Sequence, residues 1–298
     1  MRKILIILAS GLLGLILAAC SAADQAGNQV ELIGSGQKVG ADYQRWLTPP
    51  SEVETNVKIA IIPHHLLVKS FMEKFYKQLA DKNSYQRIVI LAPNHFGYGF
   101  NFVQVSDTAS GEGLGEIVVP IDVETVRSLD MAGAAKLEPK LFEREHGIYT
   151  HYPFIEKYFP KAKVVPIIIK REASEKDLSG LVEELGKLND GKTLFLASLD
   201  FTHYTGEESA VQNDIKMLEW LGDNGAKDLE SALMAGTSVD QTNESVAIDS
   251  PETLYVIGRL AEGMQFGFWA RTSSLSMIRG LSPLQNTSHI FGYYFDKK

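Results

Sequence analysis

Three of the seven histidines in the chain lie where they could build a metal site or an active site. His64, His95 and His203 each follow a short apolar run of the kind that forms a buried β-strand. If those strands are parallel, their carboxyl ends meet at one edge of a sheet, which is where open α/β folds bind ligands. Imidazole is also the commonest metal ligand among side chains. Any one of these histidines could be an ordinary loop residue, but three at strand ends favour a shared site.

The elements that would position these histidines alternate between strands and helices. Continuous apolar runs predict buried strands, and apolar residues at four-residue steps predict amphipathic helices. Strands are expected at residues 57–62, 87–92, 163–169, 193–197, 266–270 and 289–295. Helices are expected at residues 66–82, 152–158, 174–188, 207–221, 228–235 and 251–262. This alternation predicts a single α/β domain with a largely parallel central sheet flanked by helices.

One further residue and one segment are expected to have structural rather than chemical roles. His151 precedes the helix expected at residues 152–158, so we expect it to cap that helix or to lie at a rim. Residues 271–274 are expected to form a solvated turn.

Four separated motifs resemble those of one known family, in the same order and at approximately the same spacing. They are Ile61-Ile62-Pro63-His64, Ala92-Pro93-Asn94-His95, Glu145-His146-Gly147-Ile148 and Leu199-Asp200-Phe201-Thr202-His203-Tyr204. The family is Memo, called AmmeMemoRadiSam system protein B in bacteria and archaea, and the resemblance covers residues 57–294. It implies a fold similar to that of the class III extradiol dioxygenases, which hold non-haem iron with two histidines and one carboxylate.

The resemblance also implies a set of metal ligands. His64 and His95 match the two metal-binding histidines of the family, whose third ligand is a cysteine. This chain has Asp249 at the corresponding position, and two imidazoles with one carboxylate suit Fe(II), Mn(II) or Zn(II). Asp249 could instead cap a helix that begins at Pro251, and the sequence leaves both roles open. The expected cofactor is a divalent metal ion, with iron favoured and copper, manganese or zinc as alternatives.

Four more residues match groups that line the family's pocket. Asp200 and His203 match an Asp-x-x-His pair, and Glu145 and His146 match a Glu-His pair on the opposite wall. The resemblance therefore implies that these four residues are catalytic, with His203 and His146 handling protons. The chain departs from the family at Tyr149, which replaces a pocket glutamate.

The first twenty residues have the features of an export signal. Two basic residues precede an apolar run that ends in Leu17-Ala18-Ala19-Cys20, which resembles a bacterial lipobox. Residues 4–19 are too few to span a bilayer comfortably. The expected division is a lipoprotein signal peptide at 1–19, a lipidated Cys20 with a tether to residue 52, and a Memo-like domain at 53–298. We expect an exported lipoprotein of the bacterial cell envelope, held at a membrane by the lipid on Cys20.

The charge of the chain excludes one class of partner. The net charge is −8, and removal of residues 1–19 with their two basic residues would make it −10. An acidic chain has no electrostatic footprint for nucleic acid. The sequence also lacks a Gly-x-Ser-x-Gly motif, so serine hydrolase chemistry has no support.

Together these features predict a mononuclear metal site that performs redox or dioxygenase-type chemistry on a small molecule. The alternative is a non-catalytic accessory protein that binds a metal, a peptide or a cofactor for a protein partner. That alternative arises because the family is named for a system that includes a radical-SAM enzyme. The sequence does not identify the partner.

Overall fold

The computed structural model describes residues 52–112, 117, 119–223, 228–237 and 246–296, which all lie within one compact unit, Val39–Lys298. The expected signal peptide, the lipidated Cys20 and nearly all of the tether lie outside the described residues, so these assignments stay predictions. No helix among the described residues has the length and apolar character needed to cross a bilayer.

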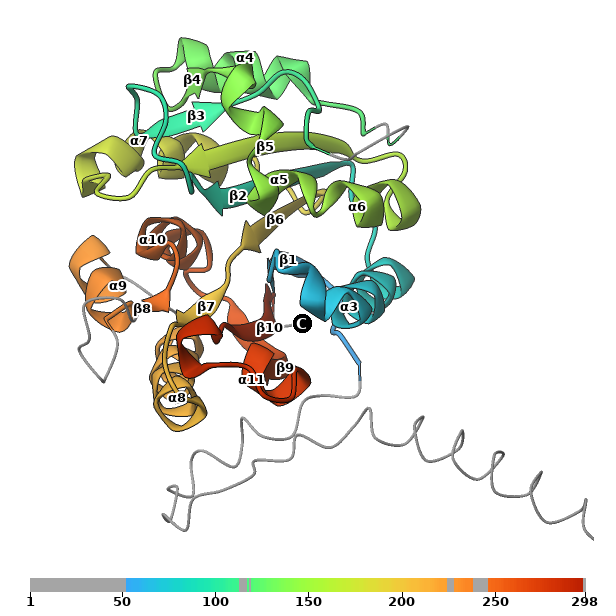
Figure 1. Cartoon of the computed structure of the whole chain (residues 1–298). Coiled ribbons are helices and arrows are strands. Elements are labelled where there is room, and N and C mark those ends of the chain that lie inside the picture. Colours follow the sequence, from blue (N-terminus) through green and yellow to red (C-terminus); the bar gives the residue numbers. More distant parts are fainter. Residues whose placement is uncertain (1–51, 113–116, 118, 224–227, 238–245, 297–298) are drawn as a thin grey trace, which may run out of the picture. The chain divides into compact units, whose positions relative to one another are not determined.

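An eight-stranded mixed sheet forms the centre of this unit, with the strand order β4-β3-β5-β2-β6-β1-β10-β9 (Figure 1). Its four middle strands are β5 (Lys163–Ile169), β2 (Arg87–Pro93), β6 (Thr193–Ser198) and β1 (Val57–Ile62). These four are parallel, so their carboxyl ends share one edge. The outer strands are β3 (Val103–Val105), β4 (Lys136–Leu137), β9 (Gln265–Ser273) and β10 (Ser288–Phe295). The predicted α/β class with a largely parallel sheet is confirmed.

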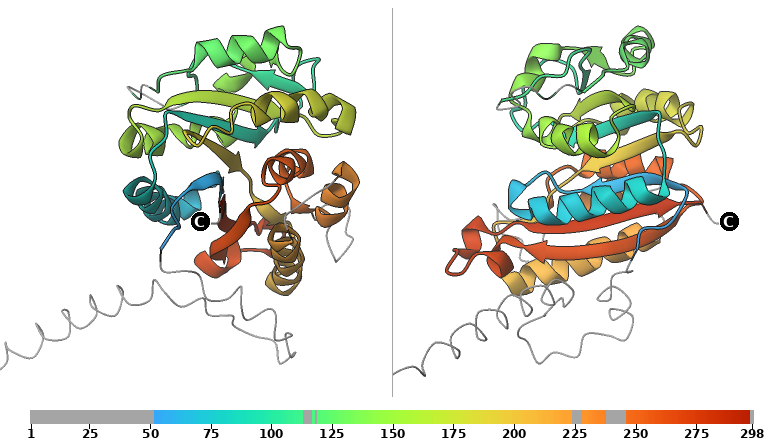
Figure 2. Two further views of the ribbon diagram at one scale, coloured as in Figure 1. Left: turned by 180° about the vertical axis from the view of Figure 1, so that it is seen from behind. Right: turned by 90° about the vertical axis from the view of Figure 1, so that its right-hand side faces the viewer.

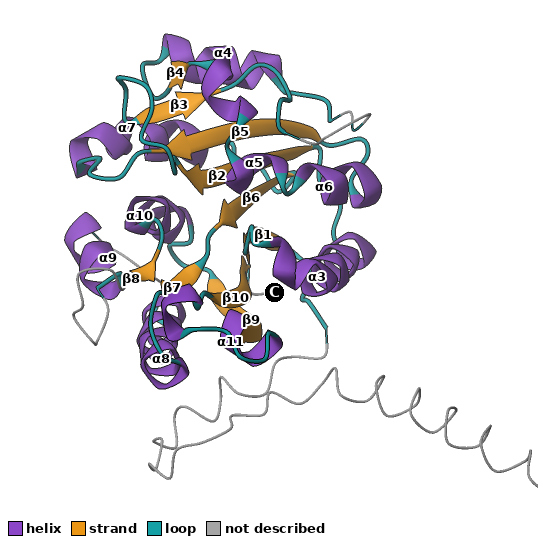
Figure 3. Ribbon diagram, viewed as in Figure 1, coloured by secondary structure: helices purple, strands orange, loops and turns teal. Residues whose placement is uncertain are grey.

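Helices cover both faces of this sheet, which forms the middle layer in Figure 3. One face is covered by α3 (Lys69–Lys82), α5 (His146–Tyr149) and α6 (Tyr152–Tyr158). The other is covered by α4 (Val123–Met131), α7 (Glu175–Gly186), α8 (Glu207–Gly222), α9 (Leu229–Ala235) and α10 (Pro251–Leu260). In the right-hand view of Figure 2, α3 (cyan) lies in front of the strands and runs along them.

Short elements complete the fold. They are the small helix α11 (Ser274–Met277), the 3-10 turns η2 (Leu66–Val68), η3 (Pro139–Glu143) and η4 (Pro283–Gln285), and an antiparallel pair of strands, β7 (Phe201–His203) and β8 (Val246–Ile248). The helix expected at residues 66–82 thus begins with a 3-10 turn, and its α-helical part starts at Lys69.

The core explains why the central strands appear in the sequence as continuous apolar runs. Successive side chains of a strand point to opposite faces of the sheet. In β1, Ile59 and Ile61 belong to one hydrophobic cluster, and Ala60 and Ile62 belong to another on the opposite face. Because helices cover both faces, every position of β1 except Lys58 is apolar.

The expected solvated turn at residues 271–274 is wrong, because Arg271 lies in β9 and only 9% of its side chain is exposed. Its Nε donates a hydrogen bond of 2.8 Å to Asp214 Oδ2, and its Nη1 donates one to Glu207 Oε1. Asp214 Oδ1 also accepts hydrogen bonds from Thr202 at 2.8 Å and from Ser288 at 2.7 Å. The ion pair therefore links α8 to both β7 and β10, which carry His203 and His289.

Replacing Arg271 with alanine would leave the Asp214 carboxylate buried without its counter-charge. We expect Arg271→Ala to lower the free energy of unfolding by about 3–5 kcal/mol, measured by urea denaturation. Lys77→Ala is the matched control, since Lys77 pairs with Asp81 on the exposed surface of α3, and it should cost far less. Equal losses in the two variants would contradict the structural role of Arg271.

Candidate metal centre

The carboxyl edge of the parallel strands brings three histidines together. His64 follows β1, His95 follows β2, and His146 is the first residue of α5. One ligand nitrogen from each lies within 4.8 Å of the other two, a grouping that could hold a metal ion. The ring centroids are 4.9 Å apart for His64 and His95, and 4.1 Å apart for His95 and His146. His64 is buried, whereas His95 and His146 are accessible, so the group faces solvent on one side.

A largely buried carboxyl, that of Asp249, lies against the same imidazoles. Asp249 Oδ2 is 3.4 Å from His64 Nε2 and 3.9 Å from His95 Nε2. The pairing of β7 with β8 holds it there, and its Oδ2 accepts a hydrogen bond of 3.1 Å from the backbone of Asp200. The helix-cap alternative for Asp249 is excluded, because Ser250 caps α10 by accepting from the backbone of Thr253 at 3.1 Å.

The Asp249 carboxyl has an unmet interaction that fits a cation. Its Oδ1 is buried and has no hydrogen-bond partner among the described residues. Burial raises the pKa of Asp249 well above its ordinary value, since the charged form has lost its hydration. Buried polar atoms normally have a partner, and a cation between the imidazoles and this carboxyl would supply one. Imidazole nitrogen and carboxylate oxygen are ligands suited to iron, manganese, zinc or copper.

Asp200 lies on the other side of His64 and is a second buried carboxyl. Its Oδ2 is 3.6 Å from His64 Nε2, and its Oδ1 is 3.4 Å from His289 Nδ1. Burial raises the pKa of Asp200, but the neighbouring imidazoles of His64 and His289 outweigh that effect and hold the pKa below its ordinary value. The two carboxyls at this edge therefore differ, since Asp200 is stabilised in its charged form and Asp249 in its neutral form.

Glu145, one of the predicted catalytic residues, is buried against His95. It accepts a hydrogen bond from His95 Nδ1 at 2.5 Å and another from the His95 backbone at 3.0 Å. It also caps α5 by accepting from the backbone of Gly147 at 3.1 Å. A carboxylate that holds one ring nitrogen leaves the other aimed at a metal, which is the usual support for a ligating histidine. These contacts suit a residue that orients His95.

Burial and neighbouring charges shift the pKa values of the three histidines in different directions. Burial lowers the pKa of His95, but the hydrogen bond and the charge of Glu145, helped by Asp249, outweigh that effect and raise it. Burial lowers the pKa of His64 well below its ordinary value, and burial together with His95 lowers that of His146. His64 and His146 are therefore favoured in the neutral form that can donate an electron pair to a metal.

His203, the fourth predicted catalytic residue, lies outside the three-histidine group on β7. Burial lowers its pKa to about 4, so its ring is neutral near pH 7. Its Nδ1 is buried and has no hydrogen-bond partner among the described residues. A neutral imidazole with an unpartnered nitrogen suits a group that holds or accepts a proton.

Sequence reasoning missed part of this edge. His151 occupies the N-cap position of α6, as expected, but its side chain makes no capping hydrogen bond, and it is fully buried rather than at a rim. Its two nitrogens contact Ser198 Oγ at 2.9 Å and Tyr76 Oη at 3.0 Å. Ser198 in turn contacts His64 Nδ1 at 3.0 Å. The only signal for Ser198 is its position as the first polar residue after the apolar run 194–197, which alone is weak.

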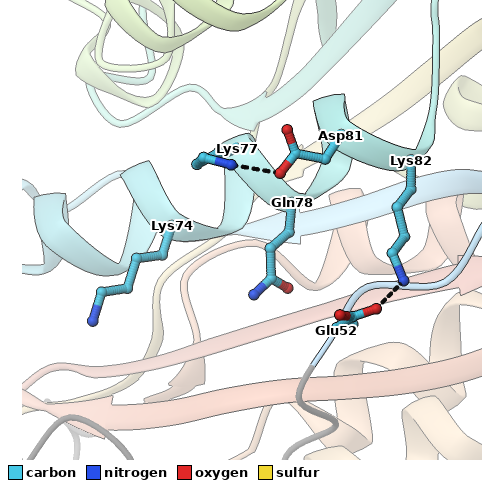
Figure 4. Close-up of a pocket in the computed structure, with 6 residues that line it drawn as sticks. All are labelled: Glu52, Lys74, Lys77, Gln78, Asp81 and Lys82. Carbon is cyan, nitrogen blue, oxygen red and sulfur yellow. Dashed lines mark hydrogen bonds and ion pairs between the residues drawn. The ribbon is translucent and has the colours of Figure 1, made fainter.

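A hollow on the outer side of α3 is separate from this edge and has no histidine in its lining. Figure 4 shows its walls, which carry the ion pairs Lys77–Asp81 and Lys82–Glu52 and the side chains of Lys74 and Gln78. Exposed lysines and carboxylates that pair with one another are ordinary surface features. The carboxyl edge of the sheet is therefore the better candidate for chemistry.

The chain thus has a mixed α/β fold whose histidines and carboxyls gather at the carboxyl edge of the parallel strands, in a grouping that could hold a metal ion. Residues 38–249, which include all the predicted ligands, match the model of the family described as Memo-like protein. This chain therefore belongs to the Memo-like family.

Relatives agree with this assignment, and a solved structure has a similar fold. The chain is similar to a MEMO1 family protein of Nitrosopumilus maritimus, with 26% identity over 66% of this chain and 73% of the relative. It is 29% identical to a MEMO1 family protein of Caldivirga maquilingensis over 44% of this chain, which spans about half of that relative (47%). The crystal structure of an uncharacterized protein from Escherichia coli K12 has a similar fold, with a TM-score of 0.55 and 13% identity over 79% of this chain and 99% of that one.

The contact between Glu145 and His95 generates a prediction about affinity. We expect Glu145→Gln to weaken the binding of a divalent metal by about 10–100-fold, because a supporting carboxylate of a ligating histidine has an effect of this size. The measurement is competition against a chelator with a known constant. Glu143→Gln, an exposed neighbour, is the matched control and should bind like the unaltered chain. Unchanged affinity in Glu145→Gln would show that this carboxylate does not support a ligand.

Proposed function

We propose that this Memo-like protein binds one divalent metal ion at the carboxyl edge of its sheet, through His64, His95 and Asp249. His146 is a further ligand that the geometry adds, because its nitrogen lies within 4.8 Å of those of His64 and His95. The observation that carries the proposal is the meeting of these imidazoles around a buried carboxyl with an unpartnered oxygen. Iron is the favoured ion, with copper, manganese and zinc as alternatives.

We further propose redox or dioxygenase-type chemistry on a small molecule, on the resemblance of the Memo fold to the class III extradiol dioxygenases. A bound metal would supply Lewis acid and redox chemistry to that molecule. The residues of the chain would hold and move protons beside it. His203 offers an unpartnered Nδ1 and a neutral ring, while Asp200 stays charged. The lipid expected on Cys20 would hold this site at a membrane, and a Cys20→Ser variant that stays membrane-bound would contradict that expectation.

Metal content tests the binding proposal. We expect close to one metal ion per chain in protein purified without oxygen, measured by elemental analysis. His64→Ala should lose affinity by more than the roughly 10–100-fold typical of an outer supporting residue. His65→Ala is the matched control, because His65 is adjacent in sequence but exposed, and it should keep the metal. Full metal content in His64→Ala would contradict the site.

An accessory role is the second candidate, and the loop after His95 favours it. Phe96, Tyr98, Phe100 and Phe102 are exposed there, with Phe100 wholly so. Exposed aromatic residues that cluster are common in protein-protein contacts. Such a surface beside a metal would suit a protein that presents the ion or a ligand to a partner.

Oxygen uptake separates the two candidates. We expect the Fe(II)-loaded chain to consume oxygen with at least one member of a panel of catechols, and His203→Gln to lose this turnover while keeping its metal. The substitution removes a titratable imidazole that lies outside the three-histidine group. Metal binding without turnover on any catechol would favour the accessory role over the enzyme.

A further inference from the structure

A row of buried polar groups leads from His64 into the core beneath α3. His64 Nδ1 lies 3.0 Å from Ser198 Oγ, and Ser198 Oγ lies 2.9 Å from His151 Nε2. His151 Nδ1 lies 3.0 Å from Tyr76 Oη. Ser198 Oγ also lies 2.6 Å from the backbone carbonyl of Gly147. Ser198, His151 and Tyr76 are fully buried, so no bulk water competes for these contacts.

The chemistry of these groups fixes the direction of each hydrogen bond. A backbone carbonyl only accepts, so Ser198 must give its single hydroxyl hydrogen to Gly147. Its oxygen then has only lone pairs left for the two imidazoles. His64 Nδ1 and His151 Nε2 must therefore both carry a hydrogen and donate it to Ser198.

The far end of the row is consistent with this assignment. Burial lowers the pKa of His151 to about 3, so the ring is neutral near pH 7 and carries one hydrogen. With that hydrogen on Nε2, its Nδ1 is an acceptor, and the hydroxyl of Tyr76 is there to donate. Every polar atom of the row has a partner of the required kind.

We propose that Ser198 is a positioning residue that fixes His64 in the tautomer with its hydrogen on Nδ1, so that Nε2 offers a lone pair to the metal centre. His64 Nε2 is the nitrogen that lies 3.4 Å from Asp249 Oδ2 and 3.6 Å from Asp200 Oδ2. Among the described residues, Nδ1 of His64 hydrogen-bonds to Ser198 alone. This inference deepens the proposed metal site and rests on it.

The two ligating histidines thus reach the same orientation by different means. Glu145 holds the Nδ1 hydrogen of His95, whereas a neutral hydroxyl holds that of His64. Both hydrogen-bonding arrangements depend on the segment around α5, which supplies Glu145 and the backbone carbonyl of Gly147. Glycine suits position 147, because an added Cβ would lie 3.0 Å from Ala92 Cβ and would push that neighbour by a few tenths of an ångström. The close packing of α5 on β2 therefore sets both ligands.

The test measures the tautomer and the affinity separately. In the metal-free chain, ¹⁵N NMR of the imidazoles should show His64 with hydrogen on Nδ1 and a bare Nε2. Ser198→Ala should give a mixture of His64 tautomers and weaken Zn(II) binding by about 10–100-fold, measured by chelator competition. Ser106→Ala is the control, since Ser106 is a buried serine whose hydroxyl bonds to Thr108, and it should change neither quantity.

The outcomes distinguish this inference from the proposed function. If the unaltered chain binds Zn(II) but its metal-free His64 carries the hydrogen on Nε2, the role of Ser198 is overturned and the metal site stands. An unchanged tautomer and affinity in Ser198→Ala would also overturn it. If the unaltered chain binds no metal, the proposed function fails, and the inference fails with it. Should Ser198→Ala not fold, the tautomer of the unaltered chain alone decides.

Discussion

The parallel pairing of three strands, with β6 between β1 and β2, determines where His64, His95 and Asp200 lie. Ile62 of β1 is in register with Ser198 of β6, and Leu91 of β2 is in register with Ala197. The chain therefore leaves all three strands at nearly the same level, and His64 and Asp200 each follow two residues beyond a paired position. A shift of one residue in either pairing would turn these side chains to the opposite face of the sheet. The apolar runs that enforce the register thus also build the site.

Burial then determines what this cluster of groups can do. Burial lowers the pKa of His64, which keeps the ring neutral, and raises the pKa of Asp249. Glu145 raises the pKa of His95, against the effect of burial. On the side away from the site, Glu145 holds His95 through a hydrogen bond to its Nδ1, and Ser198 holds His64 in the same way. The inner side brings the imidazoles beside the Asp249 carboxyl, whose Oδ1 has no hydrogen-bond partner among the described residues, and a cation there would complete the arrangement.

The sequence predicted those parts of the fold and site that depend on long apolar runs. The four parallel strands were recognisable because both of their faces are buried, and the helix expected at residues 174–188 is α7, which begins at a capping box of Ser174 and Asp177. The three-residue strands β7 and β8 were not recognisable in the sequence, because so short a segment shows no periodicity. Their pairing is what brings Asp249 beside Asp200.

Side-chain partners were harder to predict than elements. His151 and Ser198 are 47 residues apart in sequence, and only the packing of α5 and α6 on the sheet brings them together. His146 likewise owes its place beside His95 to a four-residue helix, α5, whose start depends on the Glu145 cap. Histidine positions at strand ends carry information about a site, whereas the residues that orient them depend on tertiary packing.

The most direct test of the account is a crystal structure of the metal-loaded chain with anomalous diffraction recorded at the absorption edge of the metal. The account predicts one strong anomalous peak bounded by His64 Nε2, His95 Nε2 and the carboxyl of Asp249. A peak held by other residues, or rings of His64 and His95 that turn away from each other in the loaded protein, would contradict it.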